Sequence, residues 1–418
     1  MRLRILTHYY PPEVGAPQVR LAALARGLAQ AGAEVTVHTG FPHYPDGVIK
    51  PPYRNRPLQV EQVDGVRVMR SWVYAAPNRG FARRLANHAS LATTTLAAAP
   101  SGGPVDVLLV ETPPLLLAGA AIAYARAKQA RLVLNVADLW PDSAVEMGTL
   151  GSPRAIAAAR RIERTAYREA AAIACPTEGI FTTLRARPES AAKVALMRPA
   201  VDLARFEPTA ADLGRAVARS KSAAANGEPL AVLYAGTVGL AHGLGTLLDA
   251  AEEAGRSNGT GTNGGTPALA VTIAGDGAEA PALRSRLATT GPAGVRMLGA
   301  VPADRIPGLY AESDVAVVML RDLPIFEGAL PTKLLEAMAA GRPVVLAARG
   351  EAARLVEAEG CGLVVEPEDP RALAAALTTL AGDPARRAAM GAAGRAAAER
   401  EFGREAWLHR WHDLLASA

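Results

Sequence analysis

The residues of this sequence best suited to chemistry are a lysine and a glutamate three positions apart, Lys333 and Glu336, within residues 330–345. Pro331 suits the first turn of a helix, where its missing N–H has no intrahelical partner anyway, and Thr332 is placed to cap that helix. Lys333 then lies at a helix N-terminus, which binds anions such as phosphate. Glu336, one turn further on, can accept two hydrogen bonds from vicinal hydroxyls. Phosphate beside a diol describes a nucleotide.

The elements that must position these two side chains follow from the surrounding residues. Gly341 ends the helix and Pro343 prevents it from resuming, so residues 344–346 form a buried strand. Three apolar residues recur at helical spacing and are expected to face the core: Leu334, Leu335 and Met338. The alternative for the whole segment is an ordinary amphipathic helix of an α/β protein.

A second phosphate-binding signal lies upstream. A strand over residues 230–235 leads into a loop with Gly236 and Gly239, and a helix follows from Leu244. Glycines in such a loop leave backbone N–H groups free to meet a diphosphate. The first residues of the chain predict the same order of elements: a strand over residues 4–10, a loop with Gly15, a helix over 18–31 and a strand over 35–39. Strand, glycine loop, helix and strand are typical of a doubly wound sheet.

Residues 330–345 resemble the signature of the family-4 glycosyltransferases, which are retaining enzymes of the GT-B fold. Glu336 matches the second glutamate of that signature, whereas the first would fall on Gly328, beside Glu327. A Pro-Thr-Lys segment like that at positions 331–333 occurs in the bacterial subgroup that makes lipid-linked polysaccharides. The family also has an arginine and a lysine in the loop after residue 235, where this chain has Thr237 and His242. Lys333 is therefore expected to be the main cation, with His242 as a partial substitute.

The first half of the chain carries further resemblances. Residues 10–16 are similar to the acceptor-side loop of GT-B transferases, and residues 138–143 resemble a motif of the WbuB-like branch of family 4. Many family members have a histidine near Ala137, so Asp138 becomes the polar group at this strand end; capping of the next helix is an equal alternative for it. Thr177 and Glu178 match a passage that is expected to close the first domain's site.

The resemblance implies a set of site residues. The catalytic candidates are Asp138 and Glu327, and the acceptor-side candidates are Gly15 and Arg20. The donor-binding candidates are Gly236, Thr237, Gly239, Gly299, Val301, Lys333, Leu334 and Glu336. No metal or other cofactor is expected, because helix dipoles and cations stabilise the leaving diphosphate in this fold.

The implied fold is α/β: two facing Rossmann-like domains of GT-B type with a cleft between them. Residues 1–198 form the acceptor-side domain and residues 199–401 the nucleotide-sugar domain, while a last helix over 402–418 packs back on the first domain. The implied function is retaining transfer of a sugar from a nucleotide sugar to a lipid-linked, polyprenyl-diphosphate acceptor in cell-surface polysaccharide synthesis. A sugar-nucleotide epimerase and a degenerate nucleotide-binding protein stay as alternatives.

Composition limits the remaining options. At 418 residues two domains are expected, and 50% apolar with 20% charged residues fits a soluble globular protein. The net charge is +5, but no compact run of Lys and Arg with interleaved aromatics argues for nucleic acid. Cys175 and Cys361 are expected to be buried reduced thiols of a cytoplasmic chain. The sequence enters a strand directly and contains no run of about 20 apolar residues, so neither a signal peptide nor a membrane span is expected.

Other segments carry weaker expectations. Residues 78–92 predict a basic, apolar helix that either contacts the inner face of the plasma membrane peripherally or packs, solvated, on its own domain. Asp64 and Gly65 predict a hairpin turn between two short strands. Residues 256–265 are expected to be a flexible surface insertion, and residues 372–400 are expected to be helical and alanine-rich.

Overall fold

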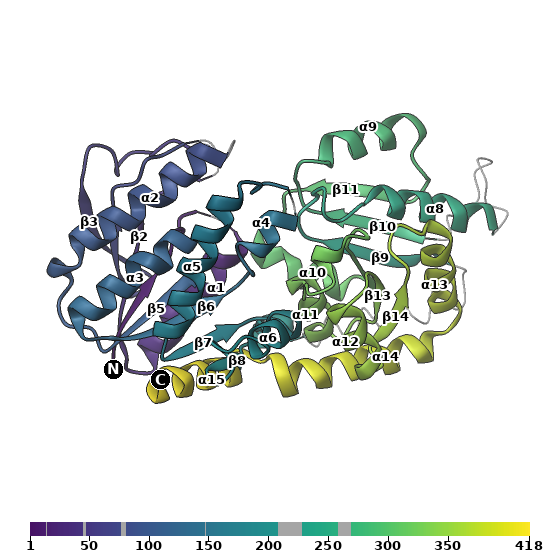
Figure 1. The fold of residues 1–418 in the computed structure, drawn as a ribbon. Helices are drawn as coiled ribbons and strands as arrows, with labels where there is room; N and C mark the ends of the chain where they lie inside the picture. The colour runs from purple at the N-terminus through teal and green to yellow at the C-terminus, as the bar shows by residue number, and fades with distance from the viewer. Residues whose placement is uncertain (14, 45–46, 77–80, 147, 208–227, 258–268) are drawn as a thin grey trace. The chain divides into compact units, whose positions relative to one another are not determined.

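The chain divides into two compact units in the computed structural model (Figure 1), which describes residues 1–418 except 14, 45–46, 77–80, 147, 208–227 and 258–268. Unit 1 comprises Met1–Arg198 together with Trp407–Ala418, and unit 2 comprises Pro199–Ala406. Both ends of the chain therefore belong to unit 1. The expected insertion over residues 256–265 and Arg79 of the basic segment fall largely or wholly outside the described residues.

Unit 1 is built on an eight-stranded sheet of order β3-β4-β2-β1-β5-β6-β7-β8. The strands are β1 (Arg2–Leu6), β2 (Glu34–Gly40), β3 (Leu58–Val63), β4 (Val66–Ser71), β5 (Val107–Thr112), β6 (Arg131–Val136), β7 (Ala172–Cys175) and β8 (Val194–Leu196). All pairs are parallel except β3 with β4, which form the predicted hairpin. Asp64 and Gly65 adopt φ angles of 50° and 80° there, as a tight hairpin turn requires. The strand predicted over residues 4–10 ends earlier, at Leu6, and Thr7 Oγ1 donates to the Tyr9 carbonyl in the loop that follows.

The helices of unit 1 are α1 (Ala16–Gln30), α2 (Phe81–Ala98), α3 (Leu115–Lys128), α4 (Asp142–Glu146), α5 (Pro153–Glu169), α6 (Glu178–Arg185) and α15 (Arg404–Ser417). Apolar strand residues of β5 and β6 and the buried faces of α3 and α5 form one core. The terminal helix packs on this unit: a Cβ added to Gly27 of α1 would lie 2.5 Å from Leu408 Cδ1. Arg131 of β6 donates to the Ala416 carbonyl at 3.1 Å.

Unit 2 contains a six-stranded, wholly parallel sheet of order β11-β10-β9-β12-β13-β14. The strands are β9 (Leu230–Ala235), β10 (Leu269–Ala274), β11 (Val295–Gly299), β12 (Val315–Met319), β13 (Val344–Ala347) and β14 (Gly362–Val365). The helices are α8 (Gly245–Ser257), α9 (Ala280–Thr290), α10 (Ile306–Ala311), α11 (Thr332–Ala339), α12 (Glu351–Glu359), α13 (Pro370–Gly382) and α14 (Pro384–Ala397). Buried residues cover both faces of this sheet, as a parallel sheet requires.

Residues 372–400 are helical, as predicted, and the chain divides them into two helices at Asp383. Pro384 has no N–H to continue the α13 ladder, and the Asp383 carboxylate accepts from the Arg386 N–H at 2.9 Å to cap the new helix α14. After Ala397 the chain makes a π-helical turn over Ala398–Phe402 before α15 begins.

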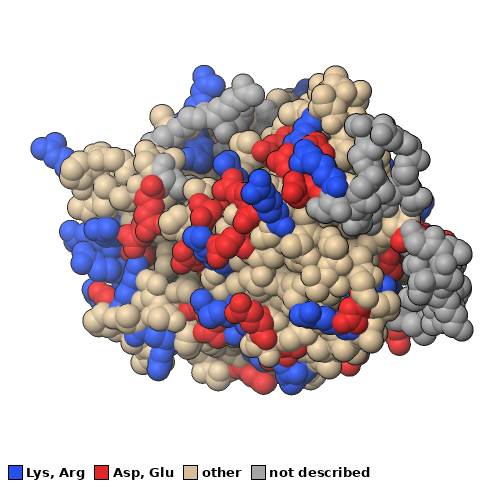
Figure 2. Space-filling model, turned by 90° about the vertical axis from the view of Figure 1, so that its right-hand side faces the viewer, with Lys and Arg blue, Asp and Glu red and all other residues tan. Residues whose placement is uncertain are grey.

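The surface carries both signs of charge. Figure 2 shows a face on which Lys and Arg side chains alternate with Asp and Glu instead of gathering by sign.

Both cysteines are free and buried, as predicted. Within the described residues, no helix has the length and apolar character needed to cross a bilayer.

Candidate active site

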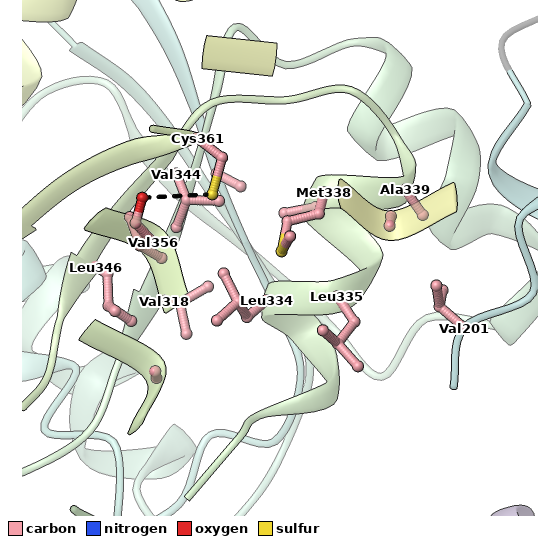
Figure 3. Packing of buried hydrophobic residues seen from close by; sticks show 14 of the residues in the cluster. Val201, Val318, Leu334, Leu335, Met338, Ala339, Val344, Leu346, Val356 and Cys361 are labelled. Atoms are coloured by element: carbon pink, nitrogen blue, oxygen red, sulfur yellow. Dashed lines mark hydrogen bonds between the residues drawn. The ribbon is translucent and has the colours of Figure 1, made fainter. Parts of the chain in front are cut away.

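Helix α11 begins one residue earlier than capping by Thr332 would require, because Thr332 is itself the first helical residue. Pro331 holds the N-cap position with an extended ψ of 133°, and no side chain caps the helix. Leu334, Leu335 and Met338 are fully buried against strand residues and Cys361, as Figure 3 shows. Gly341 follows with a φ of 63°, which favours glycine and ends the helix. This packing fixes the helix rotation and therefore the direction of its polar side chains.

Lys333 is the central charged group of unit 2. Only 8% of it is exposed, and its Nζ donates to the Tyr234 hydroxyl at 2.6 Å. The same ammonium lies 4.3 Å from the centroid of the Tyr234 ring, a cation–π distance. The tyrosine hydroxyl in turn donates to the Thr237 carbonyl at 2.6 Å. Burial lowers the pKa of Lys333 to about 7, against a smaller opposite effect of Glu336.

The glycine loop after β9 lies directly against this ammonium. Gly236 has a φ of 146°, and a Cβ added there would meet Lys333 Cε at 3.0 Å and Nζ at 3.1 Å. Gly275, directly after β10, packs closely against Gly236: a Cβ built on Gly275 would lie 1.8 Å from the Gly236 carbonyl oxygen. The Gly275 N–H donates to the Gly299 carbonyl at 2.8 Å. Three predicted or adjacent glycines thus meet at the carboxyl ends of β9, β10 and β11, the edge where such sheets bind ligands.

Glu336 lies on the same helix as Lys333 and is half-buried. Burial raises the pKa of its carboxyl, while the charges of Arg205 and Lys333 lower it. The Arg205 guanidinium lies 5.4 Å from the Phe206 ring and hydrogen-bonds the Ala303 carbonyl. A carboxylate between two cations stays able to accept hydrogen bonds from hydroxyls.

His242 does not supply a second charge, contrary to the expectation that it substitutes for a missing cation. Burial, and then the positive charge of Lys333, lower its pKa to about 4. Its ring lies 6.1 Å from that of Tyr234, and its Nδ1 is buried with no partner among the described residues. The imidazole is therefore neutral at physiological pH and forms part of the wall around the lysine. Gly239 lies beside the imidazole: a Cβ built on Gly239 would lie 3.8 Å from His242 Nδ1.

Three further candidates of unit 2 have different surroundings. The side chain of Leu334 is wholly buried in the core, as its helical spacing predicts, and its N–H donates to the Pro331 carbonyl, so its donor-binding role stays a prediction. Val301 is half-buried and packs its side chain on the same core. Glu327 is exposed, and its carbonyl accepts from the Glu351 N–H at 2.7 Å. Among the described residues, the Glu327 carboxylate makes no contact with Lys333.

In unit 1 the acceptor-side candidates contact neighbouring polar groups. Arg20 of α1 forms an ion pair with Glu111 at the end of β5, and the other Glu111 oxygen accepts from Asn135 Nδ2 at 2.5 Å. Burial raises the pKa of Glu111, against the lowering effects of Arg20 and Asn135. Gly15 precedes α1 with an extended φ of 172°, and a Cβ there would meet the Gln18 side-chain oxygen at 2.5 Å. The glycine leaves room for that side chain.

Asp138 does not cap a helix among the described residues. Its carboxylate accepts at 2.8 Å from the hydroxyl of Ser143, which lies in the first turn of α4. Thr177 instead caps α6, accepting from the Ile180 N–H at 3.4 Å, and Glu178 pairs with Arg198 at 2.7 Å. Asp138 is half-buried near the carboxyl end of the sheet, where the catalytic alternative requires it.

A buried histidine network at the same edge of unit 1 was not predicted. Asn87 Nδ2 donates to the Tyr74 carbonyl at 2.7 Å and to His43 Nε2 at 2.9 Å. Since that nitrogen is the donor, Asn87 Oδ1 accepts from His8 Nε2 at 2.6 Å. Both imidazoles therefore hydrogen-bond to the one Asn87 side chain, and burial keeps the pKa of His8 well below its usual value.

Sequence reasoning missed three polar residues: Tyr234, the penultimate residue of β9, Asn87, on the buried face of α2, and Arg205, which follows the domain boundary. A tyrosine within a buried apolar strand, next to a glycine loop, is the signal that could have found Tyr234. Among the described residues, no group of three or more His, Cys, Asp or Glu side chains could hold a metal ion.

Comparison with known proteins agrees with this geometry. Residues 15–200 match the family model "Glycosyl transferase 4-like domain", and residues 229–383 match "Glycosyl transferases group 1". A "GDP-mannose-dependent monoacylated alpha-(1-6)-phosphatidylinositol monomannoside mannosyltransferase" of Corynebacterium glutamicum is 37% identical over 155 residues, 36% of this chain and 40% of that protein. A "D-inositol 3-phosphate glycosyltransferase" of Salinispora arenicola is 30% identical over 211 residues, 47% of this chain and 44% of that protein. The matches thus span less than half of these curated relatives.

Solved structures resemble the whole chain. Sucrose-phosphate synthase of Thermosynechococcus elongatus gives a TM-score of 0.70 at 18% identity, with complete coverage of both chains. Anabaena HepE in complex with UDP and glucose gives 0.69 at 19% identity, again with complete coverage. WaaG, a glycosyltransferase of lipopolysaccharide biosynthesis, gives 0.65 at 17% identity over 99% of this chain and 100% of that one. The fold is GT-B, as predicted, and two segments of this chain, residues 15–200 and 229–383, each match a glycosyltransferase domain family.

Proposed function

We propose that this protein is a glycosyltransferase that moves a sugar from a nucleotide-sugar donor to an acceptor with retention at the anomeric carbon. The observation that carries the proposal is the buried Lys333 ammonium against Gly236. Its pKa is lowered to about 7, so the site holds its positive charge at a cost to stability. A diphosphate placed there would offset that cost.

Each candidate has a role in this proposal. Lys333 and the backbone of Gly236 and Gly239 hold the diphosphate, with the Thr237 segment tied down through Tyr234. Glu336 accepts hydrogen bonds from the ribose hydroxyls, as it would from any vicinal diol. Glu327 reaches the donor sugar, and the backbone at Gly299 and Val301 contacts the base. Asp138, Gly15 and Arg20 act on the acceptor side.

The chemistry follows from this assignment. The bond between the anomeric carbon and the diphosphate oxygen breaks, a bond to the acceptor oxygen forms on the same face, and the acceptor proton leaves with the diphosphate. The N-terminus of α11 and the Lys333 ammonium stabilise the charge that develops on the leaving group. We propose that transfer needs no metal ion, so turnover in excess EDTA should equal turnover without it.

The acceptor is proposed to be a lipid-linked, phosphate-bearing glycan intermediate, assembled at the inner face of the plasma membrane for cell-surface polysaccharide. Its support is the Asp-Leu-Trp-Pro-Asp-Ser segment at 138–143, similar to the WbuB-like branch, and the Pro-Thr-Lys segment at 331–333. The curated relatives are named for phosphatidylinositol mannoside and inositol 3-phosphate acceptors, which also carry phosphate.

The deciding experiment measures nucleoside diphosphate release from GDP-mannose and from UDP- and dTDP-sugars. Each donor is offered alone, with inositol 3-phosphate, and with a membrane lipid extract. Release that requires lipid supports the full proposal and identifies the donor. Release with inositol 3-phosphate as the sole acceptor would support the transferase proposal and refute the lipid acceptor. Release without acceptor indicates hydrolysis or epimerase chemistry, and no release with no nucleotide binding removes the proposal.

Asp138 has a separate test with a matched partner variant. If it acts on the reacting groups, Asp138→Asn should lower kcat by about 100-fold or more and leave the donor Kd unchanged. Ser143→Ala removes the hydroxyl that holds the carboxylate at 2.8 Å and should cost much less in kcat. Equal, small effects of both variants would mean that Asp138 has no catalytic role and contributes only its structural hydrogen bond with Ser143.

A further inference from the structure

Unit 1 contains a groove of about 950 Å³ that no role assigned above uses. It is bounded by the loop over residues 48–58, by the end of β4 and by the last turns of α2. Ligand-binding pockets of proteins fall at roughly 300–1,000 Å³, so the groove has the size of a binding site.

The walls of the groove are apolar and exposed. Trp72 and Val48 keep 45% and 47% of their surface exposed, and Ile49 and Leu58 line the groove beside them. The α2 side is formed by small residues, including Ala97. Large apolar side chains that cluster in one exposed concave site mark a place where apolar matter binds.

The rim of the groove is basic. Arg54 Nε donates to the Ile49 carbonyl at 2.8 Å, and Arg56 Nη1 donates to the Gln59 side-chain oxygen at 3.3 Å. Both of these acceptors are neutral, and among the residues that the structure describes, no Asp or Glu lines the groove. The charges of the two guanidiniums are therefore directed at solvent, beside an apolar hollow.

The groove also lies at the ligand-binding edge of the sheet. Ser71 and Trp72 come at the carboxyl end of β4, which runs parallel to β2 and β1. Arg70 hydrogen-bonds the Pro11 carbonyl and so joins this strand end to the loop that carries Gly15. An occupant of the groove would thus have one end near the acceptor-side loop.

We propose that this groove binds the hydrocarbon chain of an anionic amphiphile, with Arg54 and Arg56 at its phosphate: it is the lipid subsite for the acceptor. The inference rests on the proposed transferase function and adds the place of the lipid. Charge complementarity selects an anionic head group, and the concave shape favours a single chain over the flat surface of a bilayer.

The first test measures binding of decyl phosphate, below its micelle concentration, to the full-length protein through tryptophan emission. Trp72 is the exposed indole of the groove, whereas Trp407 and Trp411 are buried, and Trp72→Phe identifies its signal. We expect a blue shift that saturates, no shift with inorganic phosphate, and roughly tenfold tighter binding of dodecyl phosphate, because each buried methylene adds to affinity.

Ala97→Asp places a charge in the groove at an exposed position of α2, and Ala86→Asp places the same charge on the same helix outside the groove. We expect at least a tenfold loss of decyl phosphate affinity in the first variant and none in the second. Equal affinity in both variants would overturn the proposal. So would a change of oligomeric state in Ala97→Asp alone, because a second copy would then occupy the groove.

The head group is tested with the double variant Arg54→Gln, Arg56→Gln against Arg164→Gln, an exposed arginine of α5. The double variant should lose the preference for decyl phosphate over decyl maltoside, and the control should keep it. No preference in the native protein would overturn the anionic lipid. Nucleotide binding, measured separately by thermal shift, distinguishes these failures from failure of the transferase proposal. Lipid binding without nucleotide binding would support the lipid groove and refute the transferase function.

Discussion

The two units bury polar side chains at the same place, the carboxyl ends of their parallel strands, but balance them differently. In unit 1, Asn87 connects His8 and His43 in a buried hydrogen-bond network, and Arg20 forms an ion pair with Glu111. In unit 2, the close partners of Lys333 are a phenol oxygen and an aromatic ring, and the charge of the Glu336 carboxylate only partly offsets the cost of burial.

This difference separates a polar network that supports the fold from one that awaits a ligand. Hydrogen bonds among buried polar side chains stabilise the native state, whereas a buried ammonium without a close carboxylate destabilises it. Removing a member should therefore have opposite consequences in the two units: loss of stability in unit 1, and gain of stability with loss of binding in unit 2.

The largest effect is expected for Lys333→Met. Donor affinity should fall by about 10- to 150-fold, since hydrogen bonds to charged groups contribute about 1.5–3 kcal/mol. The free energy of unfolding at neutral pH should rise by about 1–3 kcal/mol, because the buried charge is gone. Calorimetric titration and urea unfolding measure the two. Lys128→Met, on the partly exposed side of α3, should change neither; a destabilised Lys333→Met with native affinity would refute the comparison.

In unit 1, Asn87→Leu should lower the free energy of unfolding by about 2–4 kcal/mol. It leaves the ring nitrogens of His8 and His43 and the Tyr74 carbonyl buried without their hydrogen bonds. Chemical denaturation measures the loss, and Thr93→Ala, at an exposed position of the same helix, is the control. Nucleotide affinity should not change. A neutral outcome would mean that this network contributes nothing to the fold.

Three glycine variants separate backbone strain from crowding at the ligand loop. Gly236→Ala meets both a φ of 146° and Lys333 atoms at 3.0–3.1 Å, and should cost about 2 kcal/mol of stability and about tenfold in donor affinity. Gly32→Ala has a φ of 90° but nothing within 4 Å of its Cβ, so it should cost about 1 kcal/mol. Gly239→Ala has ordinary contacts and should cost little stability. Thermal unfolding of the three proteins gives the order.

The smallest effect concerns pH. The ammonium form of Lys333 binds the diphosphate, and its pKa in the free protein is about 7. Affinity for a nucleotide sugar should be constant below that pH and fall by about fivefold to tenfold from pH 7 to 8 as the free protein loses the proton. Stability without ligand should rise with pH over the same range, because the unfolded lysine binds the proton more tightly. Lys333→Met should abolish both dependences, and a flat native profile would contradict the lowered pKa.

Local patterns predicted many of the elements in both units. The strand expected over residues 230–235 is β9 (Leu230–Ala235), and the hairpin at Asp64 and Gly65 has the expected φ angles. Gly341 and Pro343 set the end of α11 and the start of the next strand. These features depend on glycine, proline and apolar periodicity over a few residues, which act on the backbone without help from distant parts of the chain.

Local motifs indicated phosphate binding at Lys333 and at the Gly236 loop separately, and the resemblance to family-4 glycosyltransferases implied that both bind one nucleotide sugar together with Glu336. Only the tertiary structure decided how they meet. Tyr234 holds the ammonium, burial makes His242 neutral, and Leu334 faces the core while Lys333 beside it does not. Charge state and side-chain partners depend on desolvation by residues roughly 100 positions away in the chain, and no local pattern of residue types encodes that.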